Sequence, residues 1–160
     1  MINFILSIFM NMETYYHGSH ALFDRFDLDH ALEGDGKVKF GYGVYVTSKY
    51  TSAAHYSGAN PNSTDHYVYT VEIPERTSTN CIAFKEPVHP TILAAAEARL
   101  GETLPEKYLQ DAGKEFRKFL AMKLTGQKKV TLEGEKAATA FLLSIGVELI
   151  EWPYNWKSPA

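Results

Sequence analysis

The sequence predicts a single domain of the α+β class. The chain has 160 residues, which is the length of one domain, and 45% of them are hydrophobic and 22% charged, as in ordinary globular proteins. Stretches with strand character dominate the first half, whereas stretches with helical periodicity dominate the second. Because the two kinds do not alternate regularly, a doubly wound parallel sheet is disfavoured.

The first half of the chain is expected to hold three strands and one short helix. Residues 43–47 are mostly β-branched or aromatic, and residues 66–73 alternate in polarity until Pro74. Clusters of Asp, Asn, Gly and Pro mark the loops. The expected elements are strands at 14–17, 43–47 and 66–73, a helix at 50–57, a loop at 22–39 and a turn at 60–63.

The second half is expected to hold three helices and a last strand. Pro90 suits the first position of a helix that Gly101 ends, and Gly146 suits the end of the last helix. In the middle helix, apolar residues recur every three to four positions. The expected elements are helices at 91–100, 105–124 and 135–145 and a strand at 147–152.

Composition excludes several classes of function. The formal net charge of −3 excludes a generally basic coat for nucleic acid, and the one cysteine, Cys81, excludes an internal disulfide. No motif for a metal site is present, so none is expected. The apolar run at 1–10 is too short to span a membrane. It is expected to be either an element packed on the core or sequence read upstream of a start at Met12, and the protein is expected in the cytoplasm, without membrane contact.

The densest group of chemically useful residues lies in the first third of the chain. A strand ends in His17-Gly18-Ser19, which offers an imidazole, an unscreened backbone and a hydroxyl within three positions. Further along, Gly41-Tyr42-Gly43-Val44-Tyr45-Val46 precedes a helix that carries Tyr56, eleven residues after Tyr45. Two tyrosines on a strand and the next helix can hold a flat aromatic ligand between them.

These motifs resemble the ADP-ribosyltransferases of the His-Tyr-Glu class, which includes the diphtheria-toxin and poly(ADP-ribose) polymerase types. The resemblance covers residues 14–73 and, more loosely, 134–152. It implies a split β-sheet core with an NAD cleft, in which residues 88–125 form a helical insertion. It also implies transfer of ADP-ribose from NAD to a protein or nucleic acid with release of nicotinamide. Small members of the family resemble bacterial toxins, defence proteins or phage effectors, for which an antitoxin or inhibitor protein is a possible partner.

The resemblance also implies roles for individual residues. His17 would bind a ribose of NAD, the Gly18 backbone would pair with the nicotinamide carboxamide, and Tyr45 and Tyr56 would stack on the nicotinamide ring. The expected catalytic residues are His17, Tyr45 and Glu151, and the expected NAD-binding residues are His17, Gly18, Ser19, Gly43, Tyr45, Thr47 and Tyr56. The alternative is that His17 is a structural histidine and that both tyrosines belong to the core.

The acid of the family has more than one candidate in this sequence. No strand with a glutamate before an apolar run follows Trp152, so Glu151 is the first candidate and Glu148 the second. Asp24 or Asp27 could replace them, or the last strand of the family could be missing. Two functions therefore stand beside the transferase: a catalytically degenerate module that binds NAD or nucleic acid, and an NAD glycohydrolase. The basic stretch 114–129 is either a solvated helix face or a docking surface for nucleic acid or an acidic protein.

Overall fold

The computed structural model describes residues 11–30, 40–58 and 61–152, and it confirms the α+β class. The expectation for residues 1–10 lies outside this part of the chain, as does much of the expected loop at 22–39. The strands are β1 (Met12–Ser19), β2 (Tyr67–Pro74), β3 (Cys81–Ala83) and β4 (Leu149–Glu151). The helices are α1 (Tyr50–Ser57), α2 (Pro90–Leu100), α3 (Gly113–Thr125) and α4 (Leu132–Ser144), with 3-10 turns η1 (Leu28–His30) and η2 (Glu106–Leu109).

The chain forms two compact units, each discontinuous in sequence. Among the described residues, unit 1 consists of 11–27, 44–58 and 61–75, and it contains β1, α1 and β2. Unit 2 consists of 28–30, 40–43 and 76–152, and it contains the remaining elements.

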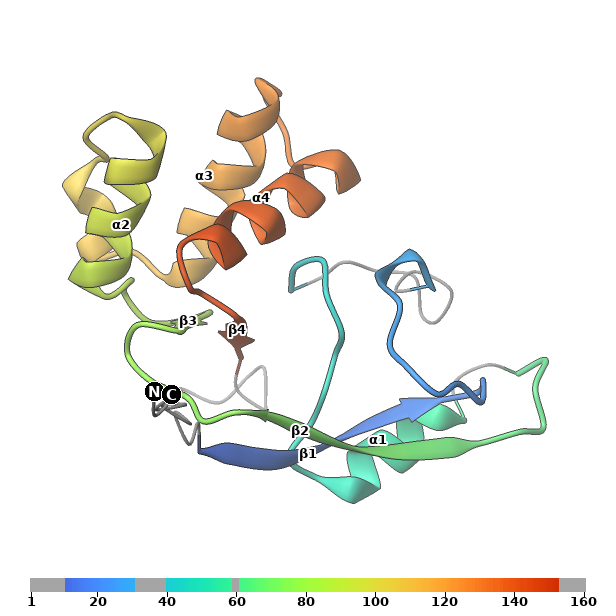
Figure 1. Ribbon diagram of the computed structural model, residues 1–160. Helices are drawn as coiled ribbons and strands as arrows, with labels where there is room; N and C mark the ends of the chain where they lie inside the picture. The colour runs from blue at the N-terminus through green and yellow to red at the C-terminus, as the bar shows by residue number, and fades with distance from the viewer. Residues whose placement is uncertain (1–10, 31–39, 59–60, 153–160) are drawn as a thin grey trace, which may run out of the picture. The chain divides into compact units, whose positions relative to one another are not determined.

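In unit 1, β1 and β2 form an antiparallel pair, and α1 packs against it (Figure 1). The packing depends on Gly18, because a Cβ there would lie 2.8 Å from both the carbonyl carbon of Ala53 and the backbone nitrogen of Ser57. Ala53 and Ser57 are the buried residues of this helix. Gly18 is therefore required at the point where the helix meets the sheet.

The strand expected at 43–47 is wrong. Thr47 alone pairs with β1, through two backbone hydrogen bonds of 2.8 Å with Tyr16. The carbonyl of Tyr45 does not join a ladder, because the side chain of His17 donates to it instead. The segment 43–47 thus pairs with β1 at Thr47 alone.

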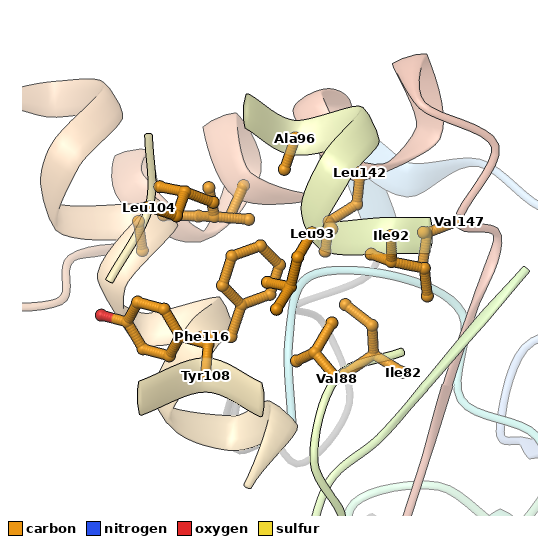
Figure 2. Packing of buried hydrophobic residues seen from close by; sticks show 13 residues of the cluster. Ile82, Val88, Ile92, Leu93, Ala96, Leu104, Tyr108, Phe116, Leu142 and Val147 are labelled. Carbon is orange, nitrogen blue, oxygen red and sulfur yellow. The ribbon is translucent and has the colours of Figure 1, made fainter. Parts of the chain in front are cut away.

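Unit 2 is built on helices that enclose a continuous apolar core (Figure 2). Helices α3 and α4 cross closely at Gly134, where a Cβ would lie 2.6 Å from the carbonyl oxygen of Ala121. Strands β3 and β4 pair in parallel beside them. The buried cluster comprises Ile82, Val88, Ile92, Leu93, Ala96, Leu104, Tyr108, Phe116, Leu120, Ala121, Ala138, Leu142 and Val147.

The expected helices are confirmed with one break. Residues 105–124 do not form one helix, since η2 ends at Leu109 and α3 starts at Gly113. The backbone of Gly113 must approach β3 closely, because a Cβ would lie 2.5 Å from the carbonyl oxygen of Ala83. Between the two helical segments, Ala112 pairs with Pro87 in an isolated β-bridge, which interrupts the helical hydrogen bonding. Helix α4 starts at Leu132, earlier than expected, because the Thr131 hydroxyl accepts from the backbone N–H of Gly134.

The core of unit 2 also contains an ion pair. The Arg117 guanidinium on α3 donates to the Glu135 carboxylate on α4, and both side chains are only 5% exposed. The Nε of Arg117 has no acceptor among the residues that the structure describes. A buried pair of this kind is costly to break, since the remaining charge is then left without a partner in an apolar surrounding.

We therefore expect Arg117→Met to lower the free energy of unfolding by about 3–5 kcal/mol, because it leaves the Glu135 carboxylate buried and unpaired. Urea titration followed by circular dichroism measures this loss. The matched variant is Arg117→Met combined with Glu135→Leu, which removes both charges and should regain most of the stability. A double variant as unstable as the single one would contradict this explanation.

Candidate functional site

His17 lies on β1 and is held in one orientation by the backbone of Tyr45. Its Nδ1 lies 2.7 Å from the Tyr45 carbonyl oxygen. A carbonyl oxygen can only accept, so Nδ1 must carry the hydrogen and donate it. In the neutral imidazole, Nε2 then has a free lone pair and can accept a hydrogen bond from a hydroxyl.

Aromatic rings surround His17 on the face of the sheet opposite α1. Its cross-strand partner on β2 is Tyr69, and the ring of Phe26 meets the imidazole edge-on with centroids 5.1 Å apart. Phe23 stacks on Tyr69 at 4.2 Å with 13° between the planes. His17 therefore sits in an aromatic cluster formed by Phe23, Phe26 and Tyr69, which restricts rotation of its ring.

The backbone of Gly18 faces the edge of β1 that β2 does not use. In an antiparallel ladder, alternate residues direct their N–H and C=O groups to opposite edges. Asn11 bonds to Glu75 on the β2 side, whereas Tyr16 bonds to Thr47 on the other side. Gly18 follows the parity of Tyr16, and its backbone groups have no partner at that edge within the described ranges. One residue thus offers a donor and an acceptor side by side.

Two predicted NAD-binding hydroxyls stabilise the backbone next to this edge. The Ser19 Oγ accepts from the N–H of Ala21 at 3.0 Å, and the Thr47 Oγ1 accepts from the N–H of Lys49 at 3.2 Å. Both side chains therefore support the local turns. A direct role of either one in binding NAD stays a prediction.

The Gly41–Gly43 part of the motif belongs to unit 2, where Tyr42 attaches it to α4. The Tyr42 carbonyl oxygen accepts from the Thr139 hydroxyl at 2.7 Å, and the Lys136 Nζ lies 5.0 Å from the centroid of the Tyr42 ring. A Cβ at Gly43 would meet no heavy atom of the described residues within 4 Å. Packing therefore gives no reason for a glycine at this position, which stays a predicted NAD-binding residue.

The two predicted stacking tyrosines both belong to unit 1 but differ in environment. Tyr45 is half-buried, and its carbonyl oxygen holds His17. Tyr56 is 62% exposed on α1, and its ring contacts that of His55. The alternative reading of Tyr56 as a core residue is therefore wrong. Stacking of both rings on a ligand stays a prediction.

The candidate acids lie on the surface. Glu151 belongs to unit 2, where its carboxylate forms an ion pair with Arg76. Glu148 is also exposed in unit 2, and Asp24 and Asp27 are exposed in unit 1. The predicted acid is thus partnered, and it would have to leave Arg76 in order to act on a substrate.

Most of the basic stretch 114–129 is neutralised or occupied. Arg117 pairs with Glu135, Lys118 with Glu115 and Lys123 with Glu102, and Lys114 lies over the ring of Phe84. Lys128 and Lys129 are exposed. The stretch is therefore a weaker candidate for a docking surface than its sequence indicates.

The described ranges contain no group of three or more His, Cys, Asp or Glu side chains placed to hold a metal ion. They also contain no helix with the length and hydropathy needed to cross a membrane.

The residues that sequence reasoning missed are the three aromatics around His17. Phe23 and Phe26 fall in a segment that reads as a polar loop, and Tyr69 reads as an ordinary strand residue. The spacing of Phe23 and Phe26 directly after His-Gly-Ser was the available signal. Aromatic residues in a loop next to a candidate site indicate that the loop folds back on it.

Comparison with known proteins adds no assignment. No protein family matches the sequence, and neither a curated protein nor a solved structure matches the chain.

Gly18 of the first motif and Gly43 of the second give a test that separates packing from ligand binding. Gly18→Ala is expected to destabilise the protein by roughly 1–3 kcal/mol, because its Cβ would overlap the backbone of α1. Gly43→Ala should change stability by less than about 1 kcal/mol, since its Cβ meets open space. Thermal unfolding measures both changes. If Gly43→Ala lost as much stability as Gly18→Ala, the conclusion that Gly18 is needed for packing and Gly43 is not would be wrong.

Cys81 next to Glu151 provides a pH-dependent test. Burial, followed by the negative charge of Glu151, raises the pKa of the Cys81 thiol to about 11. Alkylation by iodoacetamide should therefore be slow at pH 8 and increase toward pH 11, whereas the urea-unfolded chain should titrate near the ordinary value of 9.0. Since the folded state holds this proton more tightly, its contribution to stability is present below pH 9 and is lost toward pH 11. An alkylation midpoint near 9 in the folded protein would show that the thiol is not buried.

Proposed function

We propose that this protein is an NAD-dependent ADP-ribosyltransferase that moves ADP-ribose to a protein or nucleic acid and releases nicotinamide. The observation that carries the proposal is the unused edge of β1 at Gly18, next to an imidazole whose Nε2 is free to accept. The order and spacing of the His-Gly-Ser and Gly-x-Gly-Val-Tyr motifs support it, as does the Tyr45–Tyr56 interval.

The open edge suits a carboxamide. A primary amide carries a donor and an acceptor on one planar group. It can therefore bond at once to the C=O and the N–H of Gly18, which point to the same side of β1. The nicotinamide of NAD ends in such a group, and its ring would stack on Tyr45 and Tyr56.

His17 would hold the ribose. Its Nε2 lone pair accepts from a ribose hydroxyl while the Tyr45 carbonyl fixes the opposite nitrogen. Fixing the ring and the sugar together orients the glycosidic bond, and orientation of this kind is a large part of many rate enhancements.

The reaction breaks the bond between C1′ of the ribose and the nicotinamide nitrogen. The bonding electrons leave with nicotinamide, which becomes neutral, and the ribose carries an oxocarbenium-like charge. A nucleophile on the acceptor then bonds to C1′ and loses its proton. A carboxylate near this cation would stabilise it, and Glu151 is the candidate if it releases Arg76.

Two other functions remain as alternatives. Attack by water instead of an acceptor would make the protein an NAD glycohydrolase. The ion pair between Arg76 and Glu151 favours a module that binds NAD without cleaving it, since it leaves the predicted acid occupied. For the transferase we expect a cytoplasmic acceptor, and an antitoxin or inhibitor protein as a further partner.

NAD that carries a label in its ADP-ribose part, mixed with the protein and a cell lysate, tests the proposal. We expect label on a macromolecule and an equal amount of free nicotinamide. His17→Ala and Tyr45→Ala should reduce transfer on the order of 10²-fold, because the ribose or the ring is no longer oriented. The matched control is His66→Ala, an exposed histidine of unit 1, which should transfer at the wild-type rate.

The outcomes separate the three functions. Nicotinamide without labelled acceptor indicates hydrolysis, and NAD binding without nicotinamide indicates the module. If transfer persists in His17→Ala, the site at His17 and Gly18 is not where the reaction takes place. Glu151→Gln tests the acid separately, and unchanged transfer in that variant would exclude Glu151 from the mechanism.

A further inference from the structure

Tyr69 attaches the segment that follows His-Gly-Ser to the sheet. Its hydroxyl donates to the carbonyl of Ala21 at 2.9 Å and accepts from the backbone N–H of Phe23 at 2.7 Å. The same side chain stacks on the ring of Phe23. One hydroxyl thus meets both hydrogen-bonding needs of a turn two to four residues beyond Ser19.

This attachment determines where Phe26 lies. Phe26 is 38% exposed and contacts Phe23 at 5.1 Å and Tyr69 at 6.1 Å between centroids. Its ring meets His17 edge-on. A segment released from Tyr69 would lose the ring contacts that hold the Phe26 side chain against the imidazole.

The imidazole of His17 is held in two ways. The Tyr45 carbonyl fixes the Nδ1 end, but a single hydrogen bond leaves the ring free to tilt about that bond. The aromatic cluster limits the tilt. Because Nε2 must face an incoming hydroxyl to accept from it, both restraints are needed.

We propose that Tyr69 is a positioning residue that sets the orientation of the His17 ring through the 20–26 segment. The inference rests on the proposed function only where it concerns NAD. The hydrogen bonds of Tyr69 and the state of His17 can be measured without any turnover, so the two can fail separately.

The test uses Tyr69→Phe, which keeps the stacked ring and removes only the hydroxyl. We expect hydrogen exchange of the Phe23 amide to accelerate about tenfold or more, because it loses its acceptor. In NMR spectra, the His17 ring signals should shift, because the Phe26 ring is no longer held edge-on against the imidazole. If the protein also transfers ADP-ribose, the rate should fall in the same variant.

The matched control is Tyr67→Phe, which removes a hydroxyl two residues away on the same face of β2. It should leave Phe23 exchange and the His17 signals unchanged. A second variant, Phe26→Leu, should shift the His17 signals while Phe23 stays protected, because it removes the aromatic ring next to the imidazole and keeps the bonds of Tyr69.

Unchanged Phe23 exchange or unchanged His17 signals in Tyr69→Phe would overturn the inference. Should that variant fail to fold, the wild-type protein still decides: a Phe23 amide that exchanges as fast as the amide of Asp24 next to it would show that Tyr69 does not hold the segment. The two proposals can also be told apart. If the His17 signals shift in Tyr69→Phe but the wild-type protein does not cleave NAD, the positioning role is supported and the proposed function is refuted.

Discussion

The arrangement of unit 1 depends on the close contact between α1 and β1 at Gly18. A strand has two edges and two faces, and β1 uses each of them differently. One edge pairs with β2, one face carries α1, and the other face carries His17 and its aromatic neighbours. Among the described residues, the second edge pairs only at Tyr16. The close approach of α1 covers one face of the strand at Gly18. The N–H and C=O of Gly18 point to the edge of β1 that β2 does not use. The candidate site follows from this division.

Unit 2 is stabilised in a different way. Its large apolar cluster contrasts with the described part of unit 1, in which only Ala53 and Ser57 are buried. The buried ion pair of Arg117 with Glu135 joins α3 and α4, two helices that also contribute apolar residues to that cluster. A directional contact of this kind favours one register of the helices over others, whereas apolar packing alone tolerates small shifts.

The sequence predicted what depends on local chemistry. Periodicity and the Pro and Gly signals located α1, α2, α4, β1 and β2, because each is decided by side chains within the element. Prediction from the sequence failed where a contact between residues distant in sequence determines the local structure. The stretch around Tyr45 has the composition of a strand, but the Tyr45 carbonyl accepts from His17, twenty-eight residues earlier in the chain. Three-residue β3 has too few positions to show alternation, and the break before α3 depends on Gly113 meeting Ala83.

The candidate site was predictable in part: its motif residues could be identified from the sequence, but their neighbours in the fold could not. His17 and Gly18 could be selected from their motif, and the structure provides a physical setting for each of them. The aromatic neighbours and the pairing of Glu151 with Arg76 could not be selected, because both depend on which segments the fold brings together. The roles of these residues toward NAD remain proposals that the motif and this setting support.

The discontinuity of the two units has a practical consequence for dissecting the protein. Within the described ranges the backbone crosses from one unit to the other between Asp27 and Leu28, between Gly43 and Val44, and between Glu75 and Arg76. No single cut can therefore release either unit as an uninterrupted fragment. Truncations would leave incomplete pieces of both, so isolating either one calls for rejoining its segments with new linkers.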